Sequence, residues 1–490
     1  MSVMLEQMDT KRIIRSQNTS KQHKTLLGQY LTPASVANYM ASLIDFSSFD
    51  EISILDPGAG QGALGISAIE YIKKSDPTKI ISLDAYEIDK TIIDELSKNL
   101  ESISAIHHIQ YQVFKDDFIE SSVYKIGWNV QNKYSHIIMN PPYKKLSSGS
   151  MQHKLLGDVG INTVNYYSAF IWLALKMLQP NGQVIAIIPR SFCNGPYYKP
   201  FREYILQNVS LEHIHIFESR KQAFIDDDVL QENVIFVFRN SKKIRNTKIS
   251  WSSNSIMSDY NEISQPKDSI VKKEDKQLFF NIPIDGNCKD RNICPNFFST
   301  INDLGLSVST GPIVDFRLKD ELLDCISDNS VPLFYPIHFK DYRLLWPQIS
   351  KRANAINKSE YLDKNVFPKG NYVVIRRFSS KEENHRIVAS LISENDIQYP
   401  QYTFENHLNV IHDHKLGLSL YIALGLIVYL NSNYVDSEFR KFSGHTQVNA
   451  TDIKNMLFPS IDELKTMGKI LESYDSWSNF DKILEDVLYE

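Results

Sequence analysis

Hydrophobic residues in the first half of the chain fall into short apolar runs separated by longer segments with helical spacing. Short apolar runs bounded by turn residues are typical of buried strands, whereas apolar residues three and four positions apart indicate amphipathic helices. Their alternation predicts an α/β fold with a largely parallel sheet. The seven predicted strands are Ile52–Asp56, Ile80–Ala85, His108–Phe114, Ile137–Met139, Gly182–Ile188, Leu211–Phe217 and Asn233–Phe238.

The remainder of the chain has a different pattern. After Arg239 the composition shifts toward Ser, Asn, Lys and Asp, so residues 246–279 are predicted to form a linker or an excursion from the first domain. Residues 280–490 mix short strands and helices, which predicts a second domain of mixed α+β type. The apolar segment Leu416–Leu430 is about 15 residues long, short of the ~20 that a membrane-spanning helix needs, and is predicted as a core helix.

Composition places the chain among ordinary globular proteins with two domains. It has 490 residues, of which 42% are hydrophobic and 23% charged, and its formal net charge is −5. Neither half is basic overall, so any nucleic-acid binding must use local patches. The four cysteines form no CxxC pair, which disfavours zinc and suits a reducing cytoplasm. The N-terminus has no apolar secretory segment.

Residues 1–25 carry more basic than acidic side chains and are predicted to be a mobile lead-in, with a phosphate-contacting arm as the alternative. The sequence Tyr30-Leu31-Thr32-Pro33 then opens a helix, with Thr32 as the N-cap and Pro33 in the first helical position. The first domain is therefore predicted to span residues 26–245.

A glycine-rich turn follows the first predicted strand. Asp56-Pro57-Gly58-Ala59-Gly60-Gln61-Gly62 leads into a helix over Ala63–Lys74. Glycines at such a turn let the backbone approach a ligand closely, and the helix N-terminus favours negative charge. The turn is not a Walker loop. It is compatible with a nicotinamide enzyme, with a methyltransferase, and with a tight turn that binds nothing.

Acidic residues end the next two predicted strands. Glu87 follows Ile80–Ala85, where a carboxylate can accept both ribose hydroxyls of a nucleoside. Asp117 follows the third strand, where its oxygen atoms could meet the exocyclic amine of an adenine. Either carboxylate alone is more often a turn residue or a helix cap, but a glycine turn and two acids at consecutive strand ends favour a nucleoside site.

The fourth predicted strand ends in Asn140-Pro141-Pro142-Tyr143. A primary amide offers an acceptor oxygen, and a Pro-Pro segment is rigid with free carbonyl groups. Two acceptors that converge on a planar NH₂ group would turn its lone pair toward an electrophile, and Tyr143 could stack on the ring that carries the amine. A strand followed by a proline turn is the alternative.

Three other segments have two interpretations each. Lys144–Ile161 is predicted to be a flexible lid or an ordinary surface loop. Phe224 is either a core anchor or a stacking residue. Basic and aromatic residues interleave at Phe339–Arg343 and Arg376–Phe378, which suits DNA contact or side chains that cover the edge of a core.

Taken together, these motifs resemble the adenine-N6 DNA methyltransferases of bacterial type II restriction–modification systems, in the motif order called gamma. The resemblance covers residues 26–240 and rests on Gly28–Pro33, Asp56–Gly60, Glu87, Asp117-Phe118 and Asn140–Tyr143. It implies a seven-stranded Rossmann-like, S-adenosylmethionine-dependent methyltransferase domain. It also implies that residues 280–490 are a DNA target-recognition domain. Ser443–Asp452 is similar to a stretch late in such domains, where DNA contact and a structured helix cap are equal alternatives.

The resemblance also implies roles for single residues. Those implied to bind S-adenosylmethionine are Tyr30, Thr32, Asp56, Pro57, Gly58, Gly60, Glu87 and Asp117, and the catalytic residues are Asn140, Pro141, Pro142 and Tyr143. Tyr143 and Phe224 would stack on the flipped target base, and no metal is expected. The expected partners are double-stranded DNA and a separate cognate restriction endonuclease. The enzyme is expected to be a monomer in the bacterial cytoplasm.

Four alternatives compete with this hypothesis. An Asn-Pro-Pro-Tyr pocket suits any planar NH₂ group, so a methyltransferase acting on protein glutamine or on RNA is possible in principle. A non-catalytic DNA-binding module leaves the cofactor motifs without a purpose, and a nicotinamide dehydrogenase leaves Asn140–Tyr143 unexplained. Adenine is favoured over cytosine N4, because cytosine enzymes usually have Ser or Asp in place of Asn140.

Overall fold

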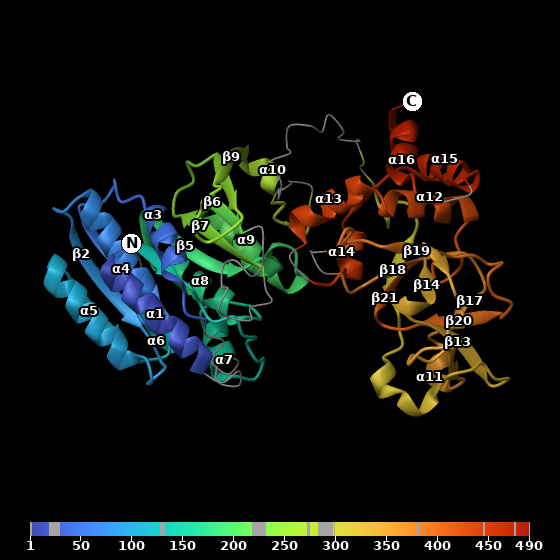
Figure 1. Cartoon of the computed structure of the whole chain (residues 1–490), viewed down its shortest axis with the longest axis horizontal. Helices are drawn as coiled ribbons and strands as arrows, with labels where there is room; N and C mark the ends of the chain where they lie inside the picture. The colour runs from blue at the N-terminus through green and yellow to red at the C-terminus, as the bar shows by residue number, and fades with distance from the viewer. Residues whose placement is uncertain are drawn as a thin grey trace. The chain divides into compact units, whose positions relative to one another are not determined.

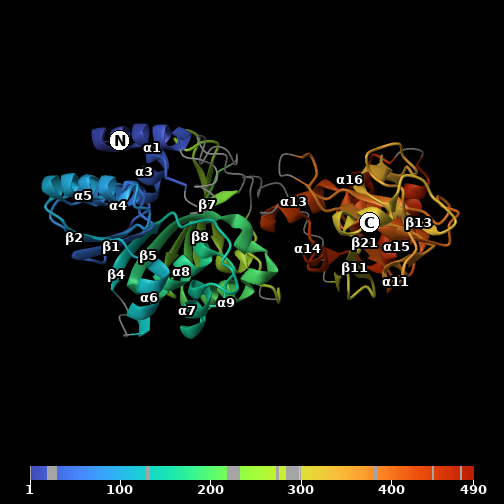
Figure 2. The same cartoon turned by 90° about the horizontal axis from the view of Figure 1, so that it is seen from below.

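The computed structural model divides the chain into two compact units, Met1–Gly286 and Asn287–Glu490 (Figures 1 and 2). The structure describes residues 2–18, 30–127, 133–217, 232–271, 275–282, 297, 299–379, 383–443, 446–474 and 477–489.

The first unit is built on one nine-stranded sheet. All seven predicted strands occur in it, but the sheet has two more. Its strands in spatial order are β3 (Gln110–Phe114), β2 (Ile80–Tyr86), β1 (Glu51–Pro57), β4 (Tyr134–Met139), β5 (Leu178–Pro189), β7 (Asn233–Arg239), β6 (Ser210–Phe217), β8 (Asn246–Ser252) and β9 (Asn261–Pro266). Strands β3 to β5 run parallel, whereas β7 lies antiparallel between β5 and β6.

The two additional strands correct the prediction of a linker over residues 246–279. Strand β8 pairs in parallel with β6, and β9 pairs antiparallel with β8. A short helix, α10 (Lys267–Ile270), follows. Strand β9 was missed because its side chains are polar and mostly exposed, as expected for a sheet edge that faces water.

Helices cover both faces of this sheet, as Figure 2 shows. Successive side chains of β5 point to opposite faces, so Val184 and Ala186 pack in one hydrophobic cluster while Ile185 and Ile187 pack in the other. One face carries α1 (Val3–Asn18), α3 (Ala34–Ser42), α4 (Ala63–Ser75) and α5 (Ile93–His107); the other carries α6 (Phe118–Gly127), α7 (Met151–Asp158), α8 (Tyr166–Lys176) and α9 (Lys199–Asn208).

Helix α1 corrects the prediction of a mobile basic lead-in. Leu5 and Met8 are buried in the same cluster as α3 and α4. The basic side chains of α1 are paired within the unit, since Lys11 and Arg15 lie 3.7 and 3.5 Å from Glu95. Residues 2–18 therefore form a helix that packs on the first unit and not a mobile lead-in. Residues 19–25 of the predicted lead-in lie outside the described residues.

The second unit holds three smaller sheets. The six-stranded sheet has the order β11 (Ser307–Thr310), β21 (Leu408–His412), β18 (Tyr372–Arg376), β19 (Ala389–Ile392), β15 (Arg343–Leu344) and β14 (Phe339–Lys340). The five-stranded sheet has the order β12 (Leu322–Leu323), β16 (Ala355–Asn357), β13 (Ser330–Phe334), β20 (Gln401–Phe404) and β17 (Phe367–Pro368). Strands β10 (Ser299–Thr300) and β22 (Leu457–Phe458) form the third.

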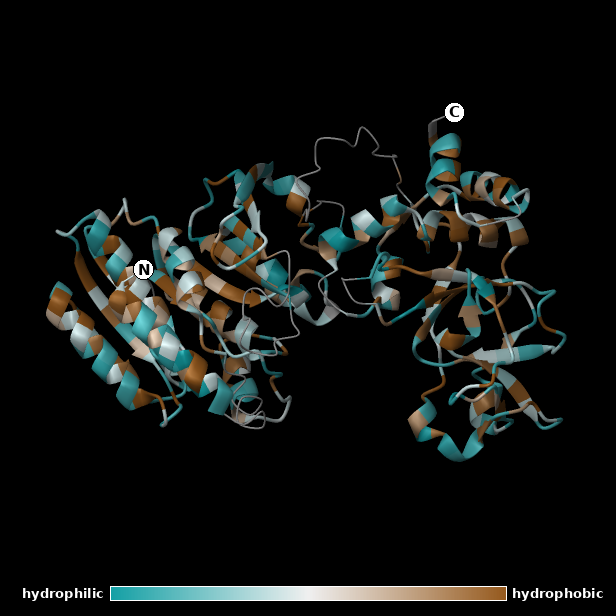
Figure 3. Ribbon diagram, viewed as in Figure 1, coloured by the Kyte–Doolittle hydropathy of each residue, from teal (hydrophilic) through white to brown (hydrophobic). Residues whose placement is uncertain are grey.

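Helices complete the second unit. The predicted core helix at Leu416–Leu430 is present as α12 (Leu420–Leu430), and its residues from Ala423 onward are buried. Its hydrophobic residues are brown in Figure 3. The other helices are α11 (Glu360–Asp363), α13 (Asn433–Phe442), α14 (Ala450–Lys454), α15 (Ile461–Glu472) and α16 (Phe480–Tyr489). Within the described part of the chain, no helix has both the length and the hydrophobicity needed to cross a membrane.

Helices α12 and α15 touch through their backbones. A Cβ atom added at Gly425 of α12 would lie 1.9 Å from the carbonyl oxygen of Leu464, and one added at Gly468 of α15 would lie 2.0 Å from that of Tyr421. Only glycine fits at either position, because real Cβ atoms do not approach backbone this closely.

Candidate active site

The glycine-rich turn after β1 lies against the end of β2. The N–H groups of Gly58 and Ala59 both donate to the carbonyl oxygen of Tyr86, at 2.9 and 2.8 Å. Gly60 has a positive φ of 57°, and a Cβ atom there would lie 2.7 Å from the Leu31 side chain. The turn therefore needs glycine at this position for both conformation and space.

Asp56, at the start of this turn, connects it to helix α4. Its side chain is fully buried, and its Oδ2 atom accepts a 3.0 Å hydrogen bond from the backbone N–H of Gly65 in α4. Burial, with a smaller effect from the charge of Glu87, raises the pKa of Asp56 to about 7. Asp56 fixes the start of α4 relative to β1, and neither it nor Pro57 lines the pocket described below.

Glu87 ties the turn to the end of β2. Its two carboxylate oxygens accept hydrogen bonds of 2.8 Å, one from Gly60 N–H and one from Asp89 N–H. The side chain is buried, and this burial raises its pKa. Because a carboxylate oxygen has more than one lone pair, Glu87 can still accept from a ligand in the pocket that it lines.

Asp117 caps α6 at the end of β3. Its Oδ1 atom accepts from the N–H groups of Ile119 and Glu120, at 2.8 and 3.2 Å. Its Oδ2 atom accepts a 3.3 Å hydrogen bond from the side chain of Gln152 in α7. The predicted lid or loop over Lys144–Ile161 thus contains a helix, and the first turn of that helix contacts Asp117.

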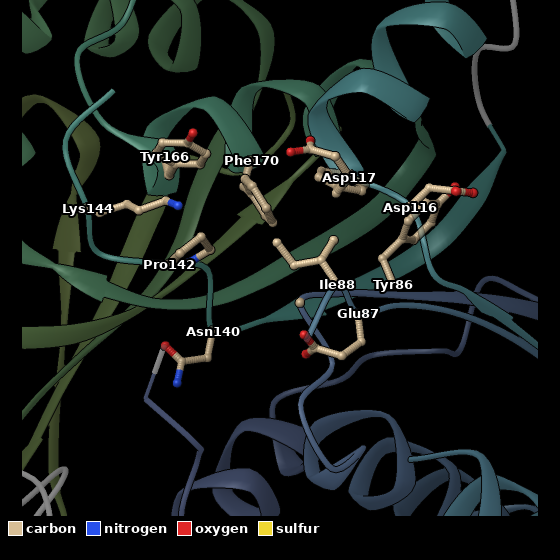
Figure 4. Close-up of a pocket in the computed structure, with 12 residues that line it drawn as sticks. Tyr86, Glu87, Ile88, Asp116, Asp117, Asn140, Pro142, Lys144, Tyr166 and Phe170 are labelled. Carbon is tan, nitrogen blue, oxygen red and sulfur yellow. The ribbon is translucent and has the colours of Figure 1, made fainter. Parts of the chain in front are cut away.

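These strand ends enclose a pocket with about 650 Å³ of space, including its open mouth. Figure 4 shows Ile88, Pro142 and Phe170 converging on it from three different elements, with Glu87 and Asp117 at its rim. The full lining is Gly58, Tyr86, Glu87, Ile88, Asp116, Asp117, Phe118, Asn140, Pro142, Lys144, Tyr166 and Phe170.

The chemistry of this pocket suits a nucleoside. Apolar side chains can cover the faces of a planar base, while carboxylates can accept from hydroxyl and amine groups at its two ends. A second, smaller pocket shares Gly58 and Asn140 with the first, and it is also lined by Tyr30, Thr32 and Gly60. Asn140 therefore stands where the two pockets meet.

The side-chain amide of Asn140 is held by the segment that precedes α3. Its Nδ2 atom donates to the carbonyl oxygen of Tyr30 at 2.8 Å and to Thr32 Oγ1 at 3.1 Å. A carbonyl can only accept, so the NH₂ group must face Tyr30, and Oδ1 remains available as an acceptor. This arrangement presents an oriented amide oxygen at the junction of the pockets.

The prediction that Thr32 caps α3 is wrong. The N-cap of α3 is Pro33, which makes no side-chain cap bond. The N–H group of Ala34 instead donates to Asp9 Oδ1 of α1, at 3.2 Å. Thr32 is left to bind Asn140, which gives it a place in the site.

The Tyr143 side chain is held by a hydrogen bond from its hydroxyl and by a contact of its ring with Tyr30. Its hydroxyl donates a 3.0 Å hydrogen bond to the carbonyl oxygen of Ile187 in β5, and its ring lies 5.8 Å from that of Tyr30 at 35°. Burial raises the pKa of Tyr143 well above its usual value, so the phenol stays neutral. Pro141 is buried beside it, whereas Phe224 lies outside the described residues.

Several lining residues were not predicted from the sequence. Ile88 and Asp116 adjoin the acids that were singled out, so the same strand ends could have indicated them. Tyr166 and Phe170 belong to α8, whose aromatic residues have the spacing of an ordinary core helix. Lys144 lies with Nζ 4.4 Å from the Tyr166 ring centre, and burial lowers its pKa despite the nearby charge of Asp117.

Comparison with known proteins places the chain in a family. The family of Eco57I restriction-modification methylases matches residues 36–224. Type II methyltransferase M.BsuBI of Bacillus subtilis is 40% identical over 502 aligned positions, covering 100% of this chain and 99% of that protein. The chain belongs to the type II restriction–modification methyltransferases. This methyltransferase is also 37% identical to M.PstI of Providencia stuartii, over 91% of its own length and 89% of that relative. It is thus a DNA methyltransferase.

Two solved structures share the fold of this methyltransferase. One is a nuclease-deletion mutant of the Type ISP restriction-modification enzyme LlaGI in complex with a DNA substrate mimic, with a TM-score of 0.52 and 12% identity. The alignment covers 90% of this chain and 54% of the LlaGI chain. The other is the DrdV–DNA complex, with a TM-score of 0.51 and 13% identity. The alignment covers 92% of this chain and 57% of the DrdV chain. At these identities the likeness concerns the fold alone.

Proposed function

We propose that this methyltransferase transfers a methyl group from S-adenosylmethionine to N6 of adenine in double-stranded DNA. The observation that carries the proposal is the Asn140 amide, which lines both pockets and is held through Nδ2 by Tyr30 and Thr32, so that Oδ1 remains available as an acceptor. The larger of the two pockets suits the cofactor. The target base would approach Asn140 from the side that faces away from this pocket.

The residues of the larger pocket fit the cofactor. Glu87 would accept from the ribose hydroxyls and Asp117 from the adenine amine, while Ile88, Pro142 and Phe170 would cover the faces of the adenine ring. When bound, S-adenosylmethionine supplies an electrophilic methyl group on a positively charged sulfur.

Asn140 and Pro141 would position the amine of the substrate. The Asn140 Oδ1 atom and the Pro141 carbonyl oxygen would each accept one of the two N6 hydrogens of adenine, which directs the nitrogen lone pair toward the methyl group. Much of the rate acceleration then comes from orientation. Methylation makes the remaining N–H groups strongly acidic, so water suffices to remove a proton and no strong protein base is needed.

The target adenine must leave the base stack before it can reach Asn140. Flipping a base costs a few kcal/mol, and stacking on an aromatic side chain contributes roughly 1–3 kcal/mol per base. The Tyr143 ring, held by Ile187 and beside Tyr30, would offer one such surface. Phe224 is proposed as the second stacking surface.

The enzyme would act as a monomer in the bacterial cytoplasm. A separate endonuclease would cut the same DNA site.

Genome sequencing tests this function directly. The chain and its Asn140→Ala variant would be expressed in a host that lacks DNA methylation, and the genomic DNA sequenced with detection of modified bases. We expect N6-methyladenine at one short motif with the native chain and none with the variant. An unmodified genome, from protein that binds the cofactor, would contradict the proposal and favour RNA or protein amides. Modified cytosine would contradict the choice of base.

A further inference from the structure

Three segments of the second unit meet beyond the end of β18. Residues 377–379 follow that strand, Glu405–His407 form the turn between β20 and β21, and residues 446–448 precede α14. Backbone hydrogen bonds join them: Arg377 N–H donates to His407 O at 2.9 Å, Val448 N–H to Arg377 O at 2.7 Å, and Ser379 N–H to Thr446 O at 3.0 Å. The backbones of these three segments are therefore held together.

Phe378 and His407 form an exposed ring pair on this surface. Their ring centres lie 4.9 Å apart at 36°, and 46% of Phe378 is exposed. The His407 side chain is 38% exposed. The pair thus offers an aromatic surface to solvent where the three segments meet, and an aromatic ring of this kind can pack against a planar base.

A buried carboxylate orients the imidazole of His407. Glu405 is fully buried, and its two oxygens accept from His407, one from Nδ1 and the other from the backbone N–H at 2.9 Å. Burying a carboxylate is costly unless it is paired. The pairing keeps a proton on Nδ1, so the other ring nitrogen of a neutral His407, Nε2, is an acceptor.

Gln447 adds a complementary group. Its side-chain oxygen faces Arg377, whose Nη2 atom lies 3.4 Å away, while Arg377 Nη1 donates to the carbonyl oxygen of Asn406 at 2.6 Å. A guanidinium can only donate, so the Gln447 oxygen must be the atom that faces it. Gln447 then has its NH₂ group, with two donors, for other contacts.

The geometry points to a surface that reads bases in the DNA target. We propose that Phe378, His407 and Gln447, here called the reading patch, contact base edges and set part of the sequence specificity; this inference rests on the proposed function. Among the described residues the patch displays a ring, an acceptor and two donors, and the charge of Arg377 is offset by the nearby Glu405. Such groups match base edges better than phosphates. Gln447 would donate to purine acceptors and His407 would accept from an exocyclic amine.

The patch also gives an atomic role to the stretch Ser443–Asp452. Its helix cap is present, since Asn449 and Asp452 form a reciprocal capping box at the start of α14. The residues just before the cap lie along residues 377–379, which brings Gln447 next to Arg377. The two interpretations of this stretch are therefore compatible, with the cap holding the segment and Gln447 making the contact.

Methylation kinetics on altered duplexes test the reading patch. The substrates are a duplex with the site found by genome sequencing and duplexes that each change one base pair of it. We expect His407→Ala and Gln447→Ala to lower kcat/KM on the intended site by about tenfold to a hundredfold and to lose discrimination at a different position each. Cofactor affinity and the salt dependence of DNA binding should match those of the native enzyme. Gln447→Glu keeps the shape of the side chain but removes its donors, so it should give the same loss.

The matched control is His414→Ala. His414 lies after β21, at the opposite end of the strand that His407 precedes, and it too has an acidic neighbour, Asp413, at 3.6 Å. It should behave like the native enzyme. Unaltered kinetics and discrimination in the His407 and Gln447 variants would overturn the inference. So would an equal loss on every duplex with a weaker salt dependence, which indicates phosphate contact. A native enzyme that does not methylate adenine would instead overturn the proposed function, and this inference with it.

Discussion

The backbone carbonyl of Tyr30 accepts a 2.8 Å hydrogen bond from the side chain of Asn140, across 110 residues of sequence. This bond joins the segment before the first strand of the sheet to the loop after the fourth. A carbonyl cannot donate, so it selects one of the two orientations of the amide. The acceptor oxygen of the proposed catalytic Asn140 is thereby oriented before any substrate binds, which is the preorganisation that methyl transfer by positioning requires.

Thr32 is expected to contribute to this orientation. Thr32→Val removes the Oγ1 acceptor of the Asn140 amide while keeping the side-chain volume, so the amide should be less well fixed and kcat should fall roughly tenfold, the equivalent of ~1.4 kcal/mol. Single-turnover methylation would measure the loss, and calorimetry should find cofactor affinity little changed. Thr32→Ser keeps the acceptor and should retain activity. A Thr32→Val enzyme with native kcat would show that Tyr30 alone orients the amide.

Tyr143 should act through its ring and not through ionisation. Tyr143→Phe removes the hydrogen bond to Ile187, which costs about 1 kcal/mol of stability, but keeps the ring beside Tyr30. Turnover should therefore stay within a few-fold of the native enzyme. Tyr143→Ala removes the stacking surface and should lower kcat by about tenfold to a hundredfold.

A duplex with a mismatch at the target adenine separates these effects, because the base is already easier to flip. The mismatch should restore part of the activity of Tyr143→Ala and change that of Tyr143→Phe little. Equal kinetics of Tyr143→Ala and the native enzyme on the matched duplex would leave Tyr143 with a structural role only.

Asp56 should make the protein less stable as the pH rises from about 4 to about 7. Its pKa is about 7 in the folded protein and 3.8 when exposed, so between these values the folded state binds more protons than the unfolded state. The free energy of unfolding then falls with rising pH, by up to ~1.4 kcal/mol per pH unit from this group. Asp56→Asn keeps an acceptor for Gly65 without a charge. Thermal melts should find it more stable than the native protein at pH 8 but not at pH 4. If the melting temperatures of Asp56→Asn and the native protein had the same pH dependence, burial of an ionisable Asp56 would be contradicted.

Three buried histidines should destabilise the protein in acid. Burial lowers the pKa of His136 and His213 to about 4 and that of His215 to about 3. His213 and His215 both bond Ser250 Oγ, at 2.7 and 2.8 Å. Below pH 6.5 these histidines therefore bind more protons in the unfolded state, and their contribution to stability is lost as the pH drops toward 4. Buried acids with a raised pKa, such as Asp56 and Glu87, act in the opposite direction.

The variant His213→Gln tests this acid sensitivity. It removes one titrating group, so its loss of unfolding free energy between pH 6.5 and 4.5 should be smaller than that of the native protein by about 1 to 3 kcal/mol. Chemical denaturation at both pH values measures the difference. A His213→Gln protein with the full native loss would mean that His213 is already charged when folded.

The sequence predicted the part of the fold that is encoded by local patterns. Strands β4 and β7 are buried along their whole length and β5 along most of its length, and their apolar runs reveal them, whereas β9 is polar and exposed and has no such run. Helix α1 was missed because few of its residues are buried, among them Leu5, Met8 and the charged Arg12. Arg12 is buried beside Asp9, at 2.7 Å, a partner that makes its charge acceptable in the interior.

The site was predictable where its residues follow strands and less so where they come from helices. Glu87, Asp117 and Asn140 each follow a strand, and parallel strand ends gather at one edge of the sheet. Phe170 and Tyr166 reach the same pocket from α8, whose pattern resembles a core helix. Local reasoning also assigned Thr32 to a cap, because the real partner of Ala34 is Asp9, which lies 25 residues away.

The backbone contact between α12 and α15 limits how this protein can acquire a new target site. Neither Gly425 nor Gly468 has room for a single methyl group, so this helix pair accepts almost no change at its centre. Phe378 and His407 are partly exposed, so their side chains can change without opening the contact between α12 and α15. Under the proposed role of the reading patch, substitutions there would alter the DNA sequence that is read while the helix pair preserves the fold.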